Sequence, residues 1–337
     1  MIISLLLIIH GLVLPVEERP ALVRIERHLA VMGTTVTISV EARDRRAALD
    51  ASEKALEALQ RTERRLSTWR KDTELSRLNE AAVNEPVRLS SEFALELSHA
   101  KRWWKATGGA FDPGIGKLSE IWGLRSGGTK PDRDLLDWAV GLPGLEALGI
   151  DGHTAVRRHP DLNIDEGGFG KGAGLDDAIR VLKDSDATAA TINLGGQVAL
   201  FGAGRPVRFD VADPSDRQRT ALTLTIDRGA LATSGNSERS LVIGERAYSH
   251  ILDPHSGMPV RDFGSLTVWA DDALAADCLS TGLYVLGPER ALEWAAKHEG
   301  IEILVLESTG KGLVARATSG LKDRLESGGP GGVLSFH

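Results

Sequence analysis

Apolar residues recur at two different periods along the chain, and each period predicts a different kind of element. Residues 34–40, "TTVTISV", alternate between polar and apolar side chains, which predicts a half-buried strand. Residues 44–66 carry apolar side chains at helical spacing with charges between them, which predicts an amphipathic helix. A second helix is expected over 91–106, because Gly108 just beyond it can adopt the left-handed conformation that ends helices.

The second half of the chain reads mainly as short strands with helices inserted between them. Residues 162–183, "LNIDEGGFGKGAGLDDAIRVLK", predict a strand, a glycine loop and a helix, and β-type runs dominate from 188 to 248. Further elements are expected as a strand at 265–270, helices at 272–286 and 288–298, and a strand at 301–307. Runs of strands with packed helices predict an α+β fold with mixed β-sheets, not a regular βαβ repeat.

Three segments are expected to lie outside this framework. Residues 126–162 are rich in Gly, Pro and Asp and are expected to form a peripheral excursion. The Gly- and Ser-rich tail, 308–337, is expected to be partly loose. The apolar opening "MIISLLLIIHGLVLP" predicts an export leader or a short membrane-associated segment over 1–20, since it is too short to span a bilayer comfortably. No cysteine follows it, so a lipoprotein anchor is not expected.

Composition and charge narrow the classes of function. A chain of 337 residues that is 42% hydrophobic and 26% charged is long enough to bury a sizeable core. The net charge of −7 and the lack of a long basic run exclude a nucleic-acid footprint. The one cysteine, Cys278, excludes an internal disulfide and a cysteine-based metal cluster. An acidic protein that handles an anionic ligand needs a local cation or backbone amides.

The glycine loop "GGFGKG", 167–172, offers one such device. It fails as a phosphate loop, because Asp165 stands at the first glycine position and Gly172 follows Lys171 where Ser or Thr is needed. It also lacks the spacing of a dinucleotide fingerprint. Two readings stay open: an anion site made by Lys171 and backbone N–H groups at a helix start, or a plain turn between strand and helix.

The apolar run "DALAADCLSTGLYVLG", 272–287, contains a carboxylate that would be costly to bury unpaired. Asp277 and Thr281 are four residues apart and therefore share one helix face. Together they offer the hard oxygen ligands that suit Mg²⁺. The alternative is that Asp277 bonds to backbone amides or to an arginine near the helix start.

Two further loops contain residues that could bind a ligand, but neither loop by itself indicates a function. "TGGAFDPGIGKL", at 107, places Phe111 and Asp112 on a tight glycine turn, although core aromatic residues are commoner than ligand platforms. "SHILDPHSGMPV", at 249, sets His250 at the mouth of an Asp-Pro turn, where a histidine by itself reads as a surface or capping residue. The glycines of "NLGGQVALFGAG", at 193, favour a ligand wrapped by backbone.

Taken together, these segments resemble the ApbE family of flavin transferases, the FAD:protein FMN transferases. The resemblance covers about residues 30–307 and rests on eight segments in order: "MGTTVTI" at 32, "STWRKDTELSRLN" at 67, "TGGAFDPGIGKL" at 107, "DEGGFGKGAGLD" at 165, "INLGGQ" at 192, "ATSGNSERS" at 232, "SHILDPHSGMPV" at 249 and "ADCLSTGLYVLG" at 276. Two departures are visible. Ala173-Gly174 stands where the family often has Tyr-Ala, and the family's usual lipoprotein cysteine is missing.

The resemblance implies a role for each matched residue. The residues implied to contact FAD are Met32, Trp69, Ala110, Phe111, Asp112, Lys171, Asp177 and Ile251. The implied ligands of a divalent cation are Asp277, Ser280, Thr281 and the backbone carbonyl of Gly174. His250 is implied to lie near the transferred phosphate and to act as base on the incoming hydroxyl.

The implied activity is Mg²⁺-dependent transfer of FMN from FAD, as substrate, to a Ser or Thr hydroxyl of an acceptor protein, forming a phosphoester bond and releasing AMP. The resemblance also implies a two-lobed domain and an acceptor in a membrane redox complex. With the apolar opening, it places the protein in the periplasm or on the extracytoplasmic side of the inner membrane.

Two alternatives remain: a Mg²⁺-dependent FAD pyrophosphatase, with water in place of the hydroxyl, and a non-catalytic flavin-binding protein. Simple flavin binding needs none of Asp277, Thr281 and His250, which argues against the second. The acceptor motif of the family, resembling D-x-x-[ST]-G-A-[ST], does not occur in the chain, so self-flavinylation is not expected.

Overall fold

A computed structural model describes residues 21–202, 205–236, 240–244, 246–310, 312–327 and 333–337, so the apolar segment 1–20 lies outside it. Its helices are α1 (Arg45–Leu66), α2 (Glu74–Glu80), α3 (Ser91–Ala106), α4 (Gly116–Ile121), α5 (Arg133–Val140), α6 (Gly170–Lys183), α7 (Ala273–Leu286) and α8 (Pro288–Ala295). Short 3₁₀ turns are η1 (Gly144–Ala147), η2 (Glu166–Gly168) and η3 (Ser319–Leu321). None of the helices within these ranges is long and apolar enough to cross a membrane.

A nine-stranded, largely antiparallel sheet forms the centre of the molecule, in the order β1-β2-β6-β7-β10-β13-β14-β15-β17. Its strands are β1 (Val23–Val31), β2 (Thr34–Ala42), β6 (Ala187–Leu194), β7 (Gln197–Gly202), β10 (Gly229–Gly235), β13 (Gly264–Ala270), β14 (Glu302–Thr309), β15 (Gly312–Ala317) and β17 (Val333–Phe336). Smaller sheets pair β16 (Leu325–Ser327), β9 (Asp216–Ile226) and β8 (Val207–Asp213); β3 (Pro86–Arg88), β5 (Thr154–Arg157) and β4 (Leu148–Asp151); and β11 (Ser240–Ile243) with β12 (Arg246–Ser249). The predicted α+β class with mixed sheets and packed helices is confirmed.

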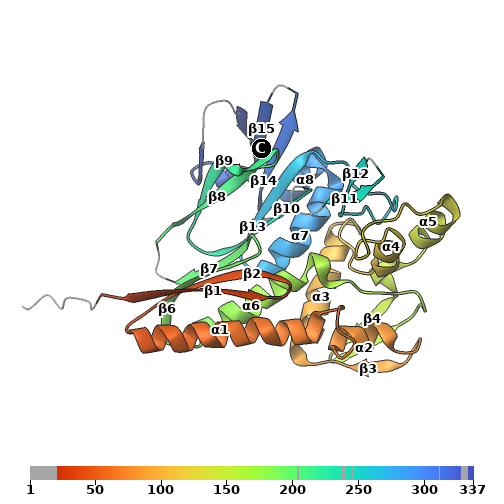
Figure 1. Cartoon of the computed structure of the whole chain (residues 1–337), viewed down its shortest axis with the longest axis horizontal. Helices are drawn as coiled ribbons and strands as arrows, with labels where there is room; N and C mark the ends of the chain where they lie inside the picture. Colours follow the sequence, from red (N-terminus) through yellow and green to blue (C-terminus); the bar gives the residue numbers. More distant parts are fainter. Residues whose placement is uncertain (1–20, 203–204, 237–239, 245, 311, 328–332) are drawn as a thin grey trace, which may run out of the picture.

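Both faces of the nine-stranded sheet are covered, by different layers. Side chains of β2, β6, β13 and β14 join those of α1, α3, α6 and α7 in the larger core. On the other face, side chains of β7, β10, β13, β14 and β15 pack against β8 and β9. Figure 1 shows α1 and α6 lying side by side beneath β1 and β2, with α2 to α5 gathered at one end of the molecule.

The amphipathic helix predicted at 44–66 is confirmed as α1, which begins after Asp44. The Asp44 side chain accepts the Ala47 N–H at 2.8 Å and so satisfies one of the free donors of the helix start. The buried face of α1 is rich in alanine, including Ala48, Ala51 and Ala55. Small side chains let α1 lie close to α6, which positions the site described below.

The hairpin between β1 and β2 turns at Met32 and Gly33, which both have positive φ (53° and 69°). A two-residue turn of this kind matches the twist of the flanking strands but strains any residue with a Cβ atom. Met32 adopts this conformation, and its sulfur lies 2.9 Å from the place a Cβ on Gly174 of α6 would take.

The structure differs from the sequence-based predictions for two peripheral segments, 126–162 and the tail 308–337. The excursion at 126–162 contains α5 and two strands, β4 and β5, which pair in the sheet with β3. The tail was expected to be partly loose, but Gly312–Ala317 pairs with β14 and Val333–Phe336 pairs with β15. These described parts of the tail therefore belong to the folded sheet, since their backbone groups are bonded to it.

Candidate active site

Asp277 lies buried in α7, with 3% of its surface exposed, and neutral donors hold its carboxylate. Its two oxygens accept the Gly172 N–H at 2.8 Å and the Gln197 side-chain amide at 2.5 Å. Burial raises the pKa of Asp277, and the positive charge of Lys171 and these two hydrogen bonds act against that rise. Of the two alternatives for Asp277, the bond to a backbone amide is present, and the carboxylate also lies beside the positive charge of Lys171.

Further oxygens surround this carboxylate. The side-chain oxygen of Gln197 is buried and has no hydrogen-bond partner among the described residues. Thr281 is half-buried, and its hydroxyl oxygen lies 3.4 Å from the place a Cβ on Gly168 would take. The Ser280 hydroxyl donates to the Asp277 carbonyl at 3.0 Å and accepts from Ser234 at 3.0 Å, so both of its bonds are made within the protein.

This donor set fits a hard divalent cation. It offers one carboxylate, an unpaired amide oxygen and a hydroxyl, which are oxygen ligands of the kind Mg²⁺ takes. The described residues contain no group of three or more His, Cys, Asp or Glu side chains suited to hold a metal. A site with one carboxylate suits a Mg²⁺ ion that keeps waters and shares substrate phosphates, and not a closed protein cage.

The glycine loop brings α6 against α7. A Cβ on Gly172 would lie 2.4 Å from the Ala273 carbonyl oxygen, so only glycine permits this approach. From the next turn of α6, Asp176 accepts the N–H groups of Ala273 and Leu274 at 2.7 and 2.9 Å and thereby caps α7. Burial raises the pKa of Asp176 to about 7. The loop therefore serves as a close-packed helix start, with Lys171 half-buried beside Asp277.

The structure places Gly174 and Asp177 away from this cluster. Gly174 packs against Met32 and Leu59, and Asp177 is buried against α1, where it accepts from Thr62 at 2.7 Å and Arg65 at 2.6 Å. Residues 172 and 174 are separated by about 200° around a helix of 3.6 residues per turn, so they face opposite sides.

The backbone that approaches Thr281 is that of Gly168 in η2, which was not predicted from the sequence. The glycine pair just before Phe169 was the available signal, because tight approaches need glycine.

The expected aromatic contact at Trp69 lies at the open rim of the site. Its side chain is 71% exposed, and the Arg125 guanidinium carbon lies 4.9 Å from the ring centre. Arg125 also donates to Thr68 at 2.5 Å and to Asp165 at 2.8 Å. Glu166 accepts from both the N–H and the hydroxyl of Thr68, at 3.1 and 2.5 Å, and burial raises its pKa. Sequence reasoning missed Arg125 and Glu166, since no local pattern links either of them to residue 69.

The segment from Ala110 to Asp112 packs beneath the site. Phe111 is 1% exposed, with its ring 3.2 Å from a Cβ placed on Gly168, so its ring lies buried against the glycine pair of η2. Ala110 is also buried, at 2%. Asp112 accepts from Gly114, Leu145 and Trp104 at 2.7, 3.0 and 3.1 Å, and burial raises its pKa to about 6.

His250 is half-buried on a segment tied to the end of β10. The preceding residue, Ser249, donates to Asn236 and accepts the Ile251 N–H at 3.0 Å. Asn236 directly follows β10, and Ser234 of β10 is the residue that bonds Ser280 of α7. One strand end therefore carries both the His250 segment and a contact to the helix of Asp277.

The turn after His250 is fixed on both sides. Asp253 accepts the Gly257 N–H at 2.8 Å through its carbonyl and donates its own N–H to Met258 at 2.9 Å. The Trp122 indole donates to the Gly257 carbonyl at 2.8 Å, and a ring nitrogen of His255 lies 3.1 Å from the Gly108 carbonyl oxygen. Ile251 is buried, with 7% exposed. Hydrogen bonds within the turn and from Trp122 and His255 therefore hold the segment that follows His250 in place.

Known proteins share this sequence and architecture. A family model described as the ApbE family matches residues 32–305. An FAD:protein FMN transferase of Vibrio cholerae is 32% identical over 266 residues, covering 76% of this chain and 79% of that protein. One of Haemophilus influenzae is 29% identical over 277 residues, covering 78% and 80%. The structure of the flavin transferase ApbE from Vibrio cholerae superimposes with a TM-score of 0.77 at 27% identity, covering 90% of this chain and all of that one. The ApbE protein of Thermotoga maritima gives 0.78 at 29% identity, covering 84% and 94%.

Proposed function

The chain belongs to the ApbE family, a family of flavin transferases, and we propose that it moves FMN from FAD onto a Ser or Thr hydroxyl of an acceptor protein with the help of Mg²⁺. The observation that carries the proposal is the buried Asp277 carboxylate, held by Gly172 and Gln197 beside Lys171. A buried carboxylate is unfavourable unless positive charge offsets it, and here Lys171 and a bound Mg²⁺ together would supply that charge. A flavin carrier has no need of it, whereas phosphoryl transfer from a pyrophosphate does.

The chemistry is a displacement at the phosphorus atom of the FMN half of FAD. The acceptor oxygen forms a bond to that phosphorus, the bond to the bridging oxygen breaks, and AMP leaves with the bridging oxygen. Such reactions depend on positioning and charge neutralisation more than on covalent work by the protein. Asp277, Thr281 and Gln197 would hold Mg²⁺, which when bound would supply positive charge to offset that of the pyrophosphate.

The other residues bind the substrate and move the proton. Lys171 would offset the negative charge of the phosphates, since it lies at the start of α6 beside the carboxylate. Trp69, with one face against Arg125 and most of its surface exposed, would stack on a planar ring of FAD. His250 would accept the proton of the acceptor hydroxyl, because a neutral alcohol is a weak nucleophile until a base removes it.

We also propose that the acceptor is a separate protein of a membrane redox complex and that the reaction occurs on the extracytoplasmic side. The support is the apolar segment 1–20, which has the length of an export signal. An exposed rim at Trp69 is compatible with a protein acceptor, since a polypeptide can reach it without large rearrangement.

The test is a mass measurement. The protein, FAD and Mg²⁺ are incubated with candidate acceptors, and the intact acceptor is examined for an FMN-sized addition while AMP is quantified. Addition to a Ser or Thr with matching AMP supports the proposal. AMP and free FMN in equal amounts with every acceptor would make the protein a pyrophosphatase, and no AMP at all would make it a flavin carrier.

A further inference from the structure

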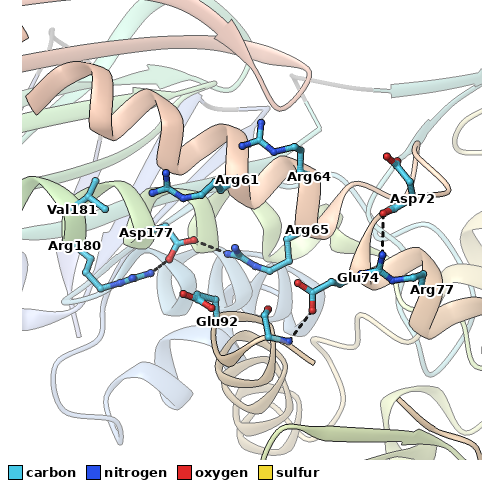
Figure 2. Close-up of a pocket in the computed structure, with 11 residues that line it drawn as sticks. Arg61, Arg64, Arg65, Asp72, Glu74, Arg77, Glu92, Asp177, Arg180 and Val181 are labelled. Carbon is cyan, nitrogen blue, oxygen red and sulfur yellow. Dashed lines mark hydrogen bonds and ion pairs between the residues drawn. The ribbon is translucent and has the colours of Figure 1, made fainter. Parts of the chain in front are cut away.

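A cavity of about 340 Å³ opens between the end of α1, the start of α2, the start of α3 and the outer face of α6. Five arginines line it: Arg61, Arg64, Arg65, Arg77 and Arg180. Figure 2 shows Arg61 and Arg64 on α1 above the cavity, with Arg65 and Asp177 below them. A chain with a net charge of −7 gives no general reason for arginines to gather at one place.

The floor of this basic cavity is a closed network. Arg65 is buried and donates to Glu96 at 3.0 Å, and also to Asp177 at 2.6 Å. Asp177 additionally accepts from Thr62 at 2.7 Å and from Arg180. The charges of Arg65 and Asp177 are therefore committed to each other, and they fix α1 against α6 beneath the cavity.

Two of the rim carboxylates already accept hydrogen bonds from neighbouring groups. Asp72 accepts two hydrogen bonds from Arg70, at 3.1 and 2.8 Å, and Glu74 accepts the Ser90 N–H at 2.9 Å. Glu92 adds an exposed carboxylate on α3. The lining therefore holds five arginines and four carboxylates, which leaves a small excess of positive charge.

Three arginines at the rim of the cavity have guanidinium N–H groups that make no strong hydrogen bond within the described residues. The Arg64 side chain has no hydrogen bond or ion pair within the described ranges, and the Arg61 guanidinium is 3.8 Å from an exposed Glu57 on the same helix. Arg77 makes a long contact of 3.5 Å to the Asp72 carbonyl oxygen. Exposed pairs of this kind contribute little, so the three guanidinium groups remain able to bind an anion.

The basic cavity is separate from the active site. Asp177 and Arg180 lie on the face of α6 that meets α1, whereas Gly172 meets Asp277 on the α7 side. In the described part of the chain, none of these arginines forms a hydrogen bond or ion pair with Trp69, Lys171 or Asp277. Occupancy of one site therefore does not require occupancy of the other.

We propose that this basic cavity binds a small dianion of the phosphate class, as free phosphate or as the terminal group of a phosphomonoester. The planar guanidinium group presents paired N–H donors that match phosphate oxygens, which makes arginine the residue suited to this ligand. Arg61, Arg64 and Arg77 contact the anion, and the buried network of Arg65 and Asp177 holds their helices in place.

The test is calorimetric titration of the full chain with inorganic phosphate at constant ionic strength, without FAD or Mg²⁺. The variant is Arg61→Gln with Arg64→Gln, and the control is Arg46→Gln, a 92% exposed arginine on the same helix outside the cavity. Loss of one or more charge-assisted hydrogen bonds is expected to weaken phosphate binding at least about tenfold in the double variant. The control should bind phosphate as the unchanged protein does.

Two results would overturn the proposal: equal phosphate affinity in the double variant, or equal weakening in Arg46→Gln, which would indicate general charge screening. Lys171→Gln is a third arm, since loss of phosphate binding in that variant would place the anion in the active site. Repeating the titration with AMP separates the sources, because only a phosphomonoester site binds AMP with the same dependence on Arg61 and Arg64. Thermal unfolding confirms that each variant is folded.

Discussion

The backbone N–H of Gly172 donates to the Asp277 carboxylate across 2.8 Å, joining the first turn of α6 to the second turn of α7. The bond exists because residue 172 has no side chain, since a Cβ there would lie 2.4 Å from the Ala273 carbonyl oxygen. One glycine thus sets the position of the carboxylate on which the proposed chemistry depends.

Gly172→Ala tests this packing. The added methyl group must push α6 and α7 apart, and overpacking of this kind costs about 1–3 kcal/mol. We expect a lower free energy of unfolding in urea and loss of FMN transfer together. Gly310→Ala is the matched control, since nothing lies within 4 Å of its added Cβ. Equal stability of the two variants would mean that the helices have room to separate.

Asp277→Asn tests the metal site. The substitution keeps the size of the side chain, removes the charge and takes away the carboxylate ligand. FMN transfer and AMP release should be abolished, and added Mg²⁺ should no longer raise the melting temperature in the presence of FAD. The protein without Mg²⁺ should be at least as stable as before, because a buried charge has been removed. Ordinary AMP release by this variant would remove Asp277 from the mechanism.

Trp69→Ala tests whether the exposed tryptophan at the rim of the site contacts FAD. Since the side chain is 71% exposed, the free energy of unfolding should change by no more than about 0.5 kcal/mol. Lost stacking should weaken FAD binding by about 1–3 kcal/mol, measured by flavin fluorescence. Trp138→Ala, at a 43% exposed tryptophan of α5, should leave FAD binding unchanged. Equal FAD affinity in both variants would exclude Trp69 as a flavin contact.

Asp176 predicts a dependence of stability on pH. Burial raises its pKa from 3.8 to about 7, so the folded protein holds this proton more tightly than the unfolded chain. This contribution to stability is present in full below pH 3.8 and is lost as the pH rises through about 7. Asp176→Asn has no proton to lose at this position, so its free energy of unfolding should not contain this decrease. As the pH rises from 3.8 to about 7, the variant should therefore gain stability relative to the unchanged protein. Asp186→Asn, an exposed position beyond α6, is the control. A constant difference across the interval would mean that the folded state does not retain the Asp176 proton.

His250→Ala separates chemistry from binding. A general base contributes about 10²–10⁴ in rate, so FMN transfer should fall by that factor while FAD affinity stays within a few fold. FAD binding is measured by equilibrium titration and transfer by the FMN mass added per unit time. If FAD affinity falls in proportion to the rate, His250 is a binding or folding residue.

Sequence periodicity was sufficient for the elements whose signals are local. The helices at 44–66 and 91–106 were predicted within a residue of α1 and α3, because apolar spacing and the capping Asp44 act within one element. The tail was missed because β15 and β17 are stabilised by partners elsewhere in the chain. Gly- and Ser-rich composition carries no information about such distant pairing.

The site was predicted in part for a similar reason. Asp277 and Thr281 follow from one helix face, so their shared position could be read from spacing alone. Gly174 and Asp177 were assigned to the site, but the rotation of α6 directs them toward α1. That rotation is set by Gly172 against Ala273, a contact between segments about a hundred residues apart.

The intact mass of an acceptor protein after incubation with FAD and Mg²⁺ tests the central claim most directly. We expect that the acceptor gains one FMN on a Ser or Thr, that AMP appears in equal amount, and that Asp277→Asn and His250→Ala both prevent the gain. An acceptor of unchanged mass in the presence of full FAD cleavage, or an FMN adduct that forms equally well with Asp277→Asn, would contradict it.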